Sequence, residues 1–355
     1  MDEVDSSPNL DKTGQPMKLT KKLGILAFSA VLAISVVLMS SCFEQVLEKP
    51  SVRPGKPQFM KLYSPDSPFN QRIPPDAEVD PNSELMVESL KDAYAIDGLF
   101  MGLREYTVAV FYADENTPRY DVTLTAEWAP KKRMLDVPIP DAARPDPEED
   151  GEMAIIDLST GYEYDFWQAR KERGRWSASW ANRISVYSNG IYENGLSARG
   201  AGFALLAGLV WPEELEAGKI EHALVFTYEF TKKDVIVWPA TETDGDTVSE
   251  KAIPEGARVQ LDPELDLDLL DVEPWEKTIA RALQEYGMFL CDDGGGFELE
   301  AINVLSYDKN PYVGLLEEEE GYAWLRSIPI DRFRVLKLDC VEGAEQEIDE
   351  SIYAD

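Results

Sequence analysis

An uncharged run of 17 residues, Leu23–Met39, separates a short leader from the rest of the chain. A basic stretch that begins at Lys18 precedes the run, and the small pair Ser40-Ser41 follows it. A basic segment, an apolar segment and small residues at a cleavage point are typical of a secretory signal peptide. We therefore expect residues 1–41 to direct export, so that only the chain after them forms the globular fold.

A cysteine directly follows the small pair. The segment Leu38-Met39-Ser40-Ser41-Cys42 resembles the lipobox of bacterial lipoprotein precursors. In that family the cysteine is diacylated on sulfur, with acyl groups such as palmitate, and becomes the first residue of the mature chain. The resemblance implies that Cys42 is lipidated. It also implies a partner membrane, the cell membrane or the outer membrane, with the body facing the periplasm or the outside.

Two other interpretations of the run stay open. The uncharged residues 23–41 would form a helix of about 28 Å, close to the hydrocarbon thickness of a bilayer. An uncleaved membrane anchor is therefore one alternative, and a buried core helix is the other. Lysines before the run and acidic residues after it agree with the positive-inside rule. Met17 is the expected true start, because the residues before it look like an overhang on a signal peptide.

The chain is strongly acidic, with 34 Lys and Arg against 67 Asp and Glu and a formal net charge of −33. Removing residues 1–41 takes away four acids and four bases, so the mature chain keeps the same net charge. Binding to nucleic acid depends on neutralising phosphates with Lys and Arg. We therefore expect no nucleic-acid partner, and we expect acyl chains rather than electrostatics to hold the protein on a membrane.

Short runs of β-branched and aromatic residues, separated by turn residues, recur through the body. This pattern predicts a mainly β fold, a β-sandwich or a jelly-roll-like arrangement with two or three helices, and α+β is the alternative. Hairpins are expected where two such runs flank a short turn. The expected hairpins pair residues 106–112 with 120–126, 162–168 with 176–181, and 288–291 with 297–305. Further strands are expected at residues 153–158, 222–230, 235–238 and 333–338, and helices at 83–95, 212–215 and 274–286.

Composition also divides the chain into parts. Residues 42–82 combine the lipidated cysteine with a Pro-rich tether or arm, and residues 83–340 form the β-rich body. Prolines and acids concentrate at residues 130–150, where the body is expected to show a loop or a domain split. Residues 341–355 read as a loose acidic tail.

Two cysteines remain after Cys42. Cys291 and Cys340 predict one disulfide if the body lies in an oxidising compartment. Two buried free thiols are the alternative.

His222 is the candidate for acid–base catalysis, because it is the one histidine in the chain and its ordinary pKa lies near neutrality. A catalytic histidine needs an orienting carboxylate, and Asp244 and Asp292 are candidates by residue type. A structural histidine on an apolar strand is the alternative.

Aromatic residues alternate along one expected strand and continue across its turn. Tyr164, Trp167 and Trp176 are candidates for stacking on a sugar, and Arg175 and Arg199 for holding a carboxylate or an acidic sugar. Cross-strand packing in the core explains the same pattern.

Acidic residues also alternate at residues 242–246 and 262–268. Calcium binds six to eight oxygens from such groups, but neither stretch has the spacing of an EF-hand loop. No cofactor or metal ligand is therefore assigned, and calcium stays an alternative to a solvated acidic face.

Parts of the segment 200–293 resemble secreted bacterial proteins of unassigned activity. The similar parts are Ala201–Gly208, Glu221–Leu224, Trp238–Ala240, Pro254–Arg258 and Tyr286–Met288. This resemblance supplies no catalytic residues, so whether the chain is an enzyme stays undecided. The leading hypothesis is an envelope lipoprotein that binds a glycan. The alternatives are a glycoside hydrolase or lyase that uses His222 or a carboxylate pair, and a structural or assembly lipoprotein.

Overall fold

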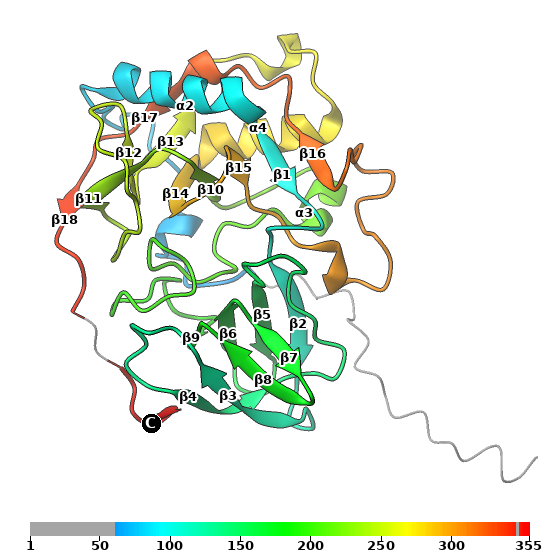
Figure 1. Cartoon of the computed structure of the whole chain (residues 1–355). Helices are drawn as coiled ribbons and strands as arrows, with labels where there is room; N and C mark the ends of the chain where they lie inside the picture. Colours follow the sequence, from blue (N-terminus) through cyan, green and yellow to red (C-terminus); the bar gives the residue numbers. More distant parts are fainter. Residues whose placement is uncertain (1–60, 346–347) are drawn as a thin grey trace, which may run out of the picture. The chain divides into compact units, whose positions relative to one another are not determined.

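The computed structural model describes residues 61–345 and 348–355, which form a mainly β fold with three α-helices (Figure 1). This confirms the predicted fold class. The predicted signal peptide, the lipobox with Cys42 and the tether as far as residue 60 lie outside the described residues. No helix within the described ranges is long and apolar enough to span a membrane.

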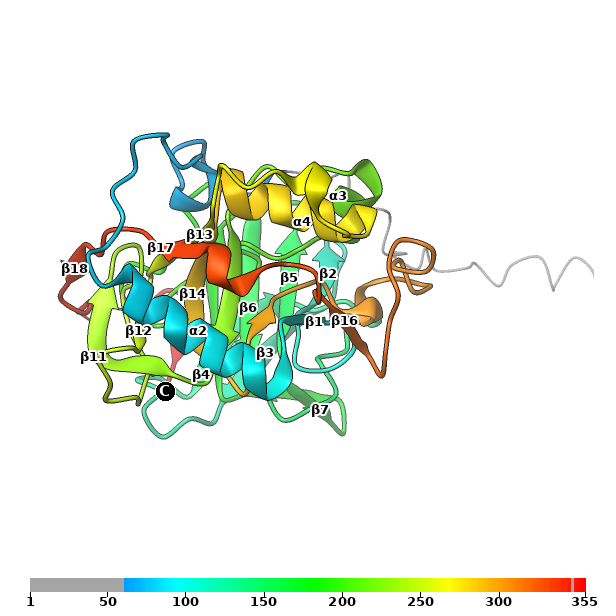
Figure 2. The ribbon, with the colours of Figure 1, turned by 90° about the horizontal axis from the view of Figure 1, so that it is seen from above.

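A seven-stranded mixed sheet carries the first hydrophobic core. The helices α2 (Ser83–Asp97) and α4 (Pro274–Glu285) bury apolar faces in this core, and Figure 2 shows both helices over the sheet. In sheet order the strands are β16 (Tyr322–Trp324), β1 (Phe100–Gly102), β15 (Glu298–Leu299), β10 (Leu224–Tyr228), β14 (Met288–Asp293), β13 (Arg258–Leu261) and β17 (Phe333–Val335).

Local sequence explains the helices well. In α4, Trp275, Ile279 and Leu283 recur every four residues and are all buried, as expected for the apolar stripe of an amphipathic helix. Pro274 occupies the first turn, where its missing N–H loses no hydrogen bond. The short helix α3 (Pro212–Ala217) ends at a left-handed glycine. The predicted helices at 83–95, 212–215 and 274–286 are confirmed.

A four-stranded sheet lies against the other face of the seven-stranded sheet. The second core joins Val110 and Ile156 of the four-stranded sheet to Val225 and Phe289 of the seven-stranded one, with the apolar segment 203–209 packed into the same cluster. The strands of the four-stranded sheet are, in order, β2 (Ala109–Ala113), β5 (Met153–Asp157), β6 (Tyr162–Trp167) and β9 (Trp180–Ser185).

A five-stranded sheet and a three-stranded sheet complete the described fold. The third core packs the four-stranded sheet against a five-stranded one, with Tyr164 and Phe166 meeting Trp176 in one cluster. The five-stranded order is β19 (Tyr353–Ala354), β4 (Arg133–Pro138), β3 (Arg119–Leu124), β8 (Arg175–Ala178) and β7 (Arg170–Glu172). The three-stranded order is β12 (Ile253–Glu255), β11 (Thr231–Val237) and β18 (Cys340–Val341). Single 3₁₀ turns lie at Pro68–Asn70, Leu267–Leu269, Val304–Ser306 and Ile330–Arg332.

Two of the three predicted hairpins are wrong, although strands lie in all the runs involved. The third, residues 162–168 with 176–181, is right at one end only, where Phe166 pairs with Ala181 and Trp167 with Trp180. β2 pairs in parallel with β5, whereas β3 pairs with β4 and β8 in another sheet. β6 pairs with β9, and β8 pairs with β7 and β3. β14 and β15 are not neighbours, because β10 lies between them. Short turns suggested pairing, but the second run of each wrong hairpin lies in another sheet or at another place in the same sheet.

Two further predictions are only partly right. Of residues 130–150, β4 occupies the first part, where Met134 and Val137 are fully buried in the third core, whereas residues 139–150 contain no helix or strand and form the predicted loop. The acidic tail is anchored at its end, since Tyr353 is buried and pairs with Met134. Burial of the apolar residues therefore fixes these segments in the fold, despite the prolines and acids around them.

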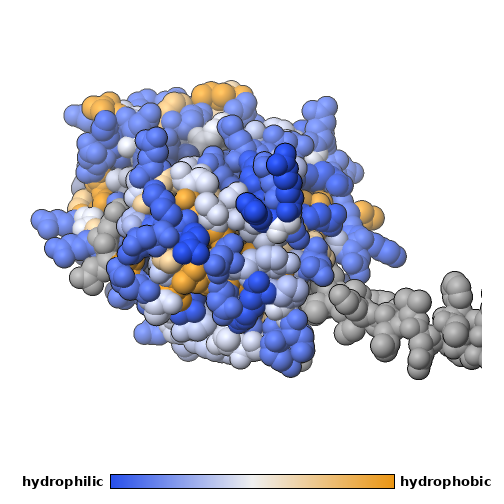
Figure 3. Space-filling model, turned by 60° about the horizontal axis from the view of Figure 1, so that its bottom comes forward, coloured by the Kyte–Doolittle hydropathy of each residue, from blue (hydrophilic) through white to orange (hydrophobic). Residues whose placement is uncertain are grey.

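The surface drawn in Figure 3 is mainly hydrophilic, and its apolar residues form small separate groups. Most of the large aromatic side chains are buried in the interior. Trp176, Trp180, Tyr228 and Tyr312 are among the largest fully buried residues. The aromatic content of the chain is therefore used largely to build the three cores.

Trp176→Ala should lower the free energy of unfolding by about 3–5 kcal/mol, the usual effect of emptying a large buried aromatic site. Trp176 is only 2% exposed, and its indole N–H has no hydrogen-bond partner. Trp176→Phe should therefore lower the free energy of unfolding much less. Urea unfolding measures both, with the neighbouring exposed Arg175→Ala as control, expected within about 0.5 kcal/mol of the parent. Equal stability of Trp176→Ala and the parent would contradict a core role.

Candidate functional site

The interior of the described fold carries many acidic side chains and few basic ones. Within residues 61–345 and 348–355, Arg199 is the only buried Lys or Arg. The buried acids are Asp146, Glu152, Asp157, Glu163, Asp165, Glu214, Glu255, Glu276, Glu298 and Glu300. A charged group taken out of water loses several kcal/mol of solvation. Each of these carboxyl groups therefore requires a donor, a cation or a proton.

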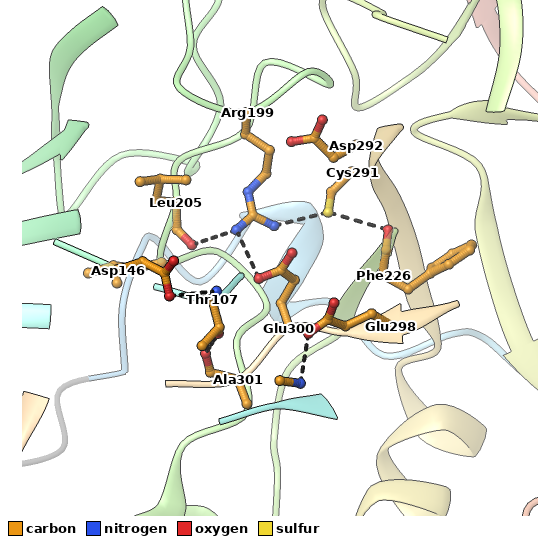
Figure 4. A network of polar contacts seen from close by, with 12 residues as sticks. Thr107, Asp146, Arg199, Leu205, Phe226, Cys291, Asp292, Glu298, Glu300 and Ala301 are labelled. Carbon is orange, nitrogen blue, oxygen red and sulfur yellow. Dashed lines mark hydrogen bonds and ion pairs between the residues drawn. The ribbon is translucent and has the colours of Figure 1, made fainter. Parts of the chain in front are cut away.

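Arg199 lies at the centre of this interior, in the loop that follows β9 (Figure 4). One Nη atom donates to the carbonyl of Leu205 at 3.1 Å and lies 3.9 Å from Oε2 of Glu300. The other Nη donates to Sγ of Cys291 at 2.9 Å. The guanidinium therefore connects the loop to β14 and to the residue that follows β15.

The predicted disulfide is wrong, because both cysteines are free. Cys291 is buried in β14, where its thiol accepts from Arg199 and can donate to the carbonyl of Phe226 at 3.3 Å. Cys340 is exposed on β18 in a different sheet. Burial raises the pKa of the Cys291 thiol well above its ordinary value, although Arg199 opposes the shift. Cys291 is therefore a neutral packing residue and not an activated nucleophile.

Carboxyl groups around Arg199 rely on protons and backbone donors. Burial raises the pKa of Glu152 and Glu298 well above the ordinary range, and the charge of Glu300 adds to both shifts. Glu298 accepts from the backbone N–H of Gly102 at 2.7 Å. One guanidinium cannot neutralise all of these groups, and burial favours their protonated forms.

A second buried pair lies on β6, where Glu163 and Asp165 point to the same face. Glu163 accepts from the hydroxyl of Tyr63 at 2.7 Å and from the N–H of Leu206 at 3.0 Å. Asp165 accepts from the hydroxyl of Tyr192 at 2.9 Å. Burial raises the pKa of Asp165 to about 6 and that of Glu163 well above its ordinary range. The pair holds the loops that carry Tyr63, Tyr192 and Leu206 against β6.

The structure separates His222 from its predicted partners. Its ring contacts Glu214, with Nε2 3.1 Å from Oε2, and the carbonyl of Ala223, 2.9 Å from Nδ1. Both partners only accept hydrogen bonds, so both ring nitrogens carry protons and the imidazole is charged. Burial lowers its pKa, but the charge and hydrogen bond of Glu214 outweigh this effect and raise it above the ordinary value. The cavity beside the ring measures only about 30 Å³, so it offers no room for a substrate.

Glu214 explains what this charged histidine does. The same carboxylate oxygen accepts from the N–H of Trp211, the residue that precedes α3. His222 therefore ties α3 to the start of β10, which is a structural role. Asp244 and Asp292, in contrast, do lie together, and Glu255 joins them within 4.8 Å.

The predicted sugar-stacking surface does not exist as one surface. Tyr164 and Trp176 are 3% and 2% exposed and belong to the third core. Trp167 is half-buried beside Asp150, and Arg175 is exposed on β8. Arg199 lies in the interior and contacts Cys291. These five residues therefore cannot hold one ligand, because the alternating aromatics fill the space between two sheets.

A cavity that the sequence did not single out lies between α2 and β16, with a volume of about 500 Å³. β16 is an edge strand, and its alternate residues Tyr322 and Trp324 point to the same side. Phe100 supports both rings, at centroid distances of 5.4 and 5.3 Å. The cavity is lined by Tyr94, Asp97, Gly98, Leu99, Glu319, Glu320, Tyr322, Trp324 and Arg326.

The cavity is acidic on balance. Arg326 pairs with Glu319 at 2.5 Å and lies over the Trp324 ring, 5.6 Å from its centroid. The remaining charged groups on the cavity wall are the carboxylates of Asp97 and Glu320. The signal in the sequence was the Tyr-Ala-Trp alternation at 322–324, which is too short to stand out among many aromatic runs.

Comparison of the chain with protein-family models, with curated proteins and with solved structures finds no match. The site must therefore be interpreted from its own geometry.

His222→Ala should lower the free energy of unfolding by about 1.5–3 kcal/mol at pH 6, the range for a hydrogen bond to a charged group. Because the pKa of His222 is higher in the folded than in the unfolded state, protonation of His222 stabilises the folded protein. This stabilisation is complete below about pH 6.5 and is lost as the pH rises through the folded pKa. The loss on mutation should therefore be smaller at pH 9. Urea unfolding at the two pH values measures it, and an equal loss at both would contradict the charged pair.

Asp165→Asn should flatten the pH dependence of stability between about pH 4 and pH 7. A carboxyl whose folded pKa is raised binds its proton more tightly when folded, so its stabilisation is complete at low pH and declines as the pH rises through about 6. The decline should amount to roughly 3 kcal/mol. Thermal unfolding of parent and variant across this range measures the difference. This difference includes the effect of Asp165 on Glu163, because the charge of Asp165 also raises the pKa of Glu163. Parallel curves would contradict the shifted pKa.

Proposed function

We propose that the chain is a lipid-anchored protein of the bacterial cell envelope whose body binds a carbohydrate in the cavity between α2 and β16. The leader and lipobox-like pattern, residues 18–42, support export and anchoring. The aromatic wall of the cavity, Tyr322 and Trp324 on an edge strand, is the observation that carries the ligand class.

The chemistry of the wall suits a sugar. The C–H faces of a sugar ring pack on aromatic faces, and its hydroxyls donate to carboxylates such as Asp97 and Glu320. Cavities of about 300–1,000 Å³ typically hold small-molecule ligands, and this cavity lies within that range at about 500 Å³. Support from Phe100 holds the rings in place before binding, which reduces the entropy lost on association.

Charge narrows the class of sugar. Arg326 and Glu319 neutralise each other, so Asp97 and Glu320 set the sign of the wall. A negative wall in a chain of net charge −33 repels acidic sugars. We therefore favour a neutral sugar or an amino sugar over the acidic sugar that the arginines near 175 suggested.

A polysaccharide-hydrolysing enzyme is the second candidate. Asp97, Glu319 and Glu320 all line the cavity, and glycoside hydrolysis uses a pair of such carboxyl groups. Release of reducing ends from a bound glycan, lost in both Asp97→Asn and Glu320→Gln, would favour it over binding alone.

Trp324→Ala should weaken carbohydrate binding at least tenfold, because a central aromatic contact typically contributes 2 kcal/mol or more. The full-length chain in detergent is tested on an array of neutral, amino and acidic glycans, and the affinity for each hit is then measured by calorimetry. Trp324→Phe should retain part of the affinity because it keeps an aromatic face.

Tyr187→Ala is the matched control, since Tyr187 is 69% exposed and does not line the cavity. It should bind as the parent does. The proposal is wrong if no glycan class binds, or if Trp324→Ala and the parent bind equally well.

A further inference from the structure

Three carboxylates from separate parts of the chain meet beside the Arg199 loop. Asp244 lies in the connection between β11 and β12, Glu255 ends β12, and Asp292 lies in β14. One oxygen from each falls within 4.8 Å of the others. Like charges at this separation repel each other strongly unless something positive lies among them.

Backbone donors fix one oxygen of each carboxylate. The N–H of Asp244 donates to Oε2 of Glu255 at 3.1 Å, and the N–H of Asp293 donates to Oδ1 of Asp244 at 3.1 Å. The N–H of Gly200 donates to Oδ2 of Asp292 at 3.2 Å. These bonds orient the three groups and leave further oxygen lone pairs for a ligand.

Glu255 is the strongest sign of such a ligand. Its side chain is fully buried, yet Oε1 has no hydrogen-bond partner. Burial and the charge of Asp244 both disfavour its ionised form. A buried carboxylate oxygen without a partner normally signals a missing water, ion or proton.

Gly200 makes room for the cluster. A β-carbon at this position would lie 2.6 Å from Oδ1 of Asp244 and 2.8 Å from Oε1 of Glu255. Both distances are far inside van der Waals contact, so any larger residue would push the carboxylates apart. The same close approach directs Oε1 of Glu255 and Oδ1 of Asp244 toward one small volume.

Arg199 does not neutralise the cluster by itself. Burial and the charges of Asp244 and Glu255 raise the pKa of Asp292 well above its ordinary range, and Arg199 only partly opposes this shift. The hydrogen bonds of Arg199 go instead to Leu205 and Cys291. Asp293 and Asp246 add further negative charge nearby. The acidic groups around Glu255 therefore outnumber the nearby guanidinium.

We infer that Asp244, Glu255 and Asp292 bind a divalent cation, and that calcium is the cation. The donors are all carboxylate oxygens, which suit a hard cation rather than zinc or copper. Calcium accepts irregular sets of six to eight oxygens, and the exposed side of Asp244 lets water complete the set. The ion would clamp the connection between β11 and β12 onto β14, joining the three-stranded and seven-stranded sheets.

Calorimetric titration of the full-length chain, stripped with EDTA and kept in detergent with 0.15 M NaCl, tests this site with CaCl₂ as the probe. We expect one saturable event with a dissociation constant of about 10⁻⁴–10⁻³ M, the range of extracellular calcium modules. Calcium should also raise the melting temperature. Glu255→Gln and Asp292→Asn should each weaken binding at least tenfold and remove most of the rise.

Asp244→Asn tests the same loss of calcium binding in a variant that is expected to fold. Asp244 is exposed, and asparagine in its place can still accept from the N–H of Asp293. The exposed Glu264→Gln is the matched control: it removes one charge outside the cluster and should bind as the parent does. No saturable binding by the parent would overturn the proposal. So would equal weakening in Glu264→Gln, since that pattern indicates diffuse attraction to an acidic surface. Trp324→Ala should keep calcium binding, so the carbohydrate and calcium proposals stand or fall separately.

Discussion

The guanidinium of Arg199 compensates negative charge in the middle of the protein. It is buried where the loop after β9 meets β14 and β15, and it bonds to Leu205 and Cys291 while facing Glu300. Removing it would leave several buried carboxyl groups without their nearest cation, which is usually more damaging than removing both partners of a pair. This one positive charge therefore supports the region where the loop after β9 meets the seven-stranded sheet.

Other buried acids are stabilised without a cation. Backbone and tyrosine donors hold Glu163 and Asp165, and burial raises the pKa of both carboxyl groups. His222 solves the problem for Glu214 by carrying the opposite charge. The cluster around Glu255 differs, because oxygens of three carboxyl groups converge within 4.8 Å and Oε1 of the buried Glu255 has no hydrogen-bond partner. This difference is why we assign a metal ion there and nowhere else in the described interior.

The two proposed ligand sites use different parts of the fold. The cavity beside β16 lies at an edge of the seven-stranded sheet, where side chains meet solvent. The acidic cluster lies where β12 and β14 approach the Arg199 loop. A calcium ion would stabilise the fold, whereas a sugar at the edge would be exchanged with the surroundings.

The sequence by itself determined the mainly β class and the three helices, because helix periodicity and capping depend on neighbours within a few residues. It also singled out Asp244 and Asp292. Only the tertiary structure decided that β10 separates β14 from β15, that Tyr164 and Trp176 are core, and that Glu255 completes the acidic cluster. Strand pairing and burial are set by segments far away in the chain. An alternating aromatic run has the same local pattern whether a second sheet or a sugar covers it.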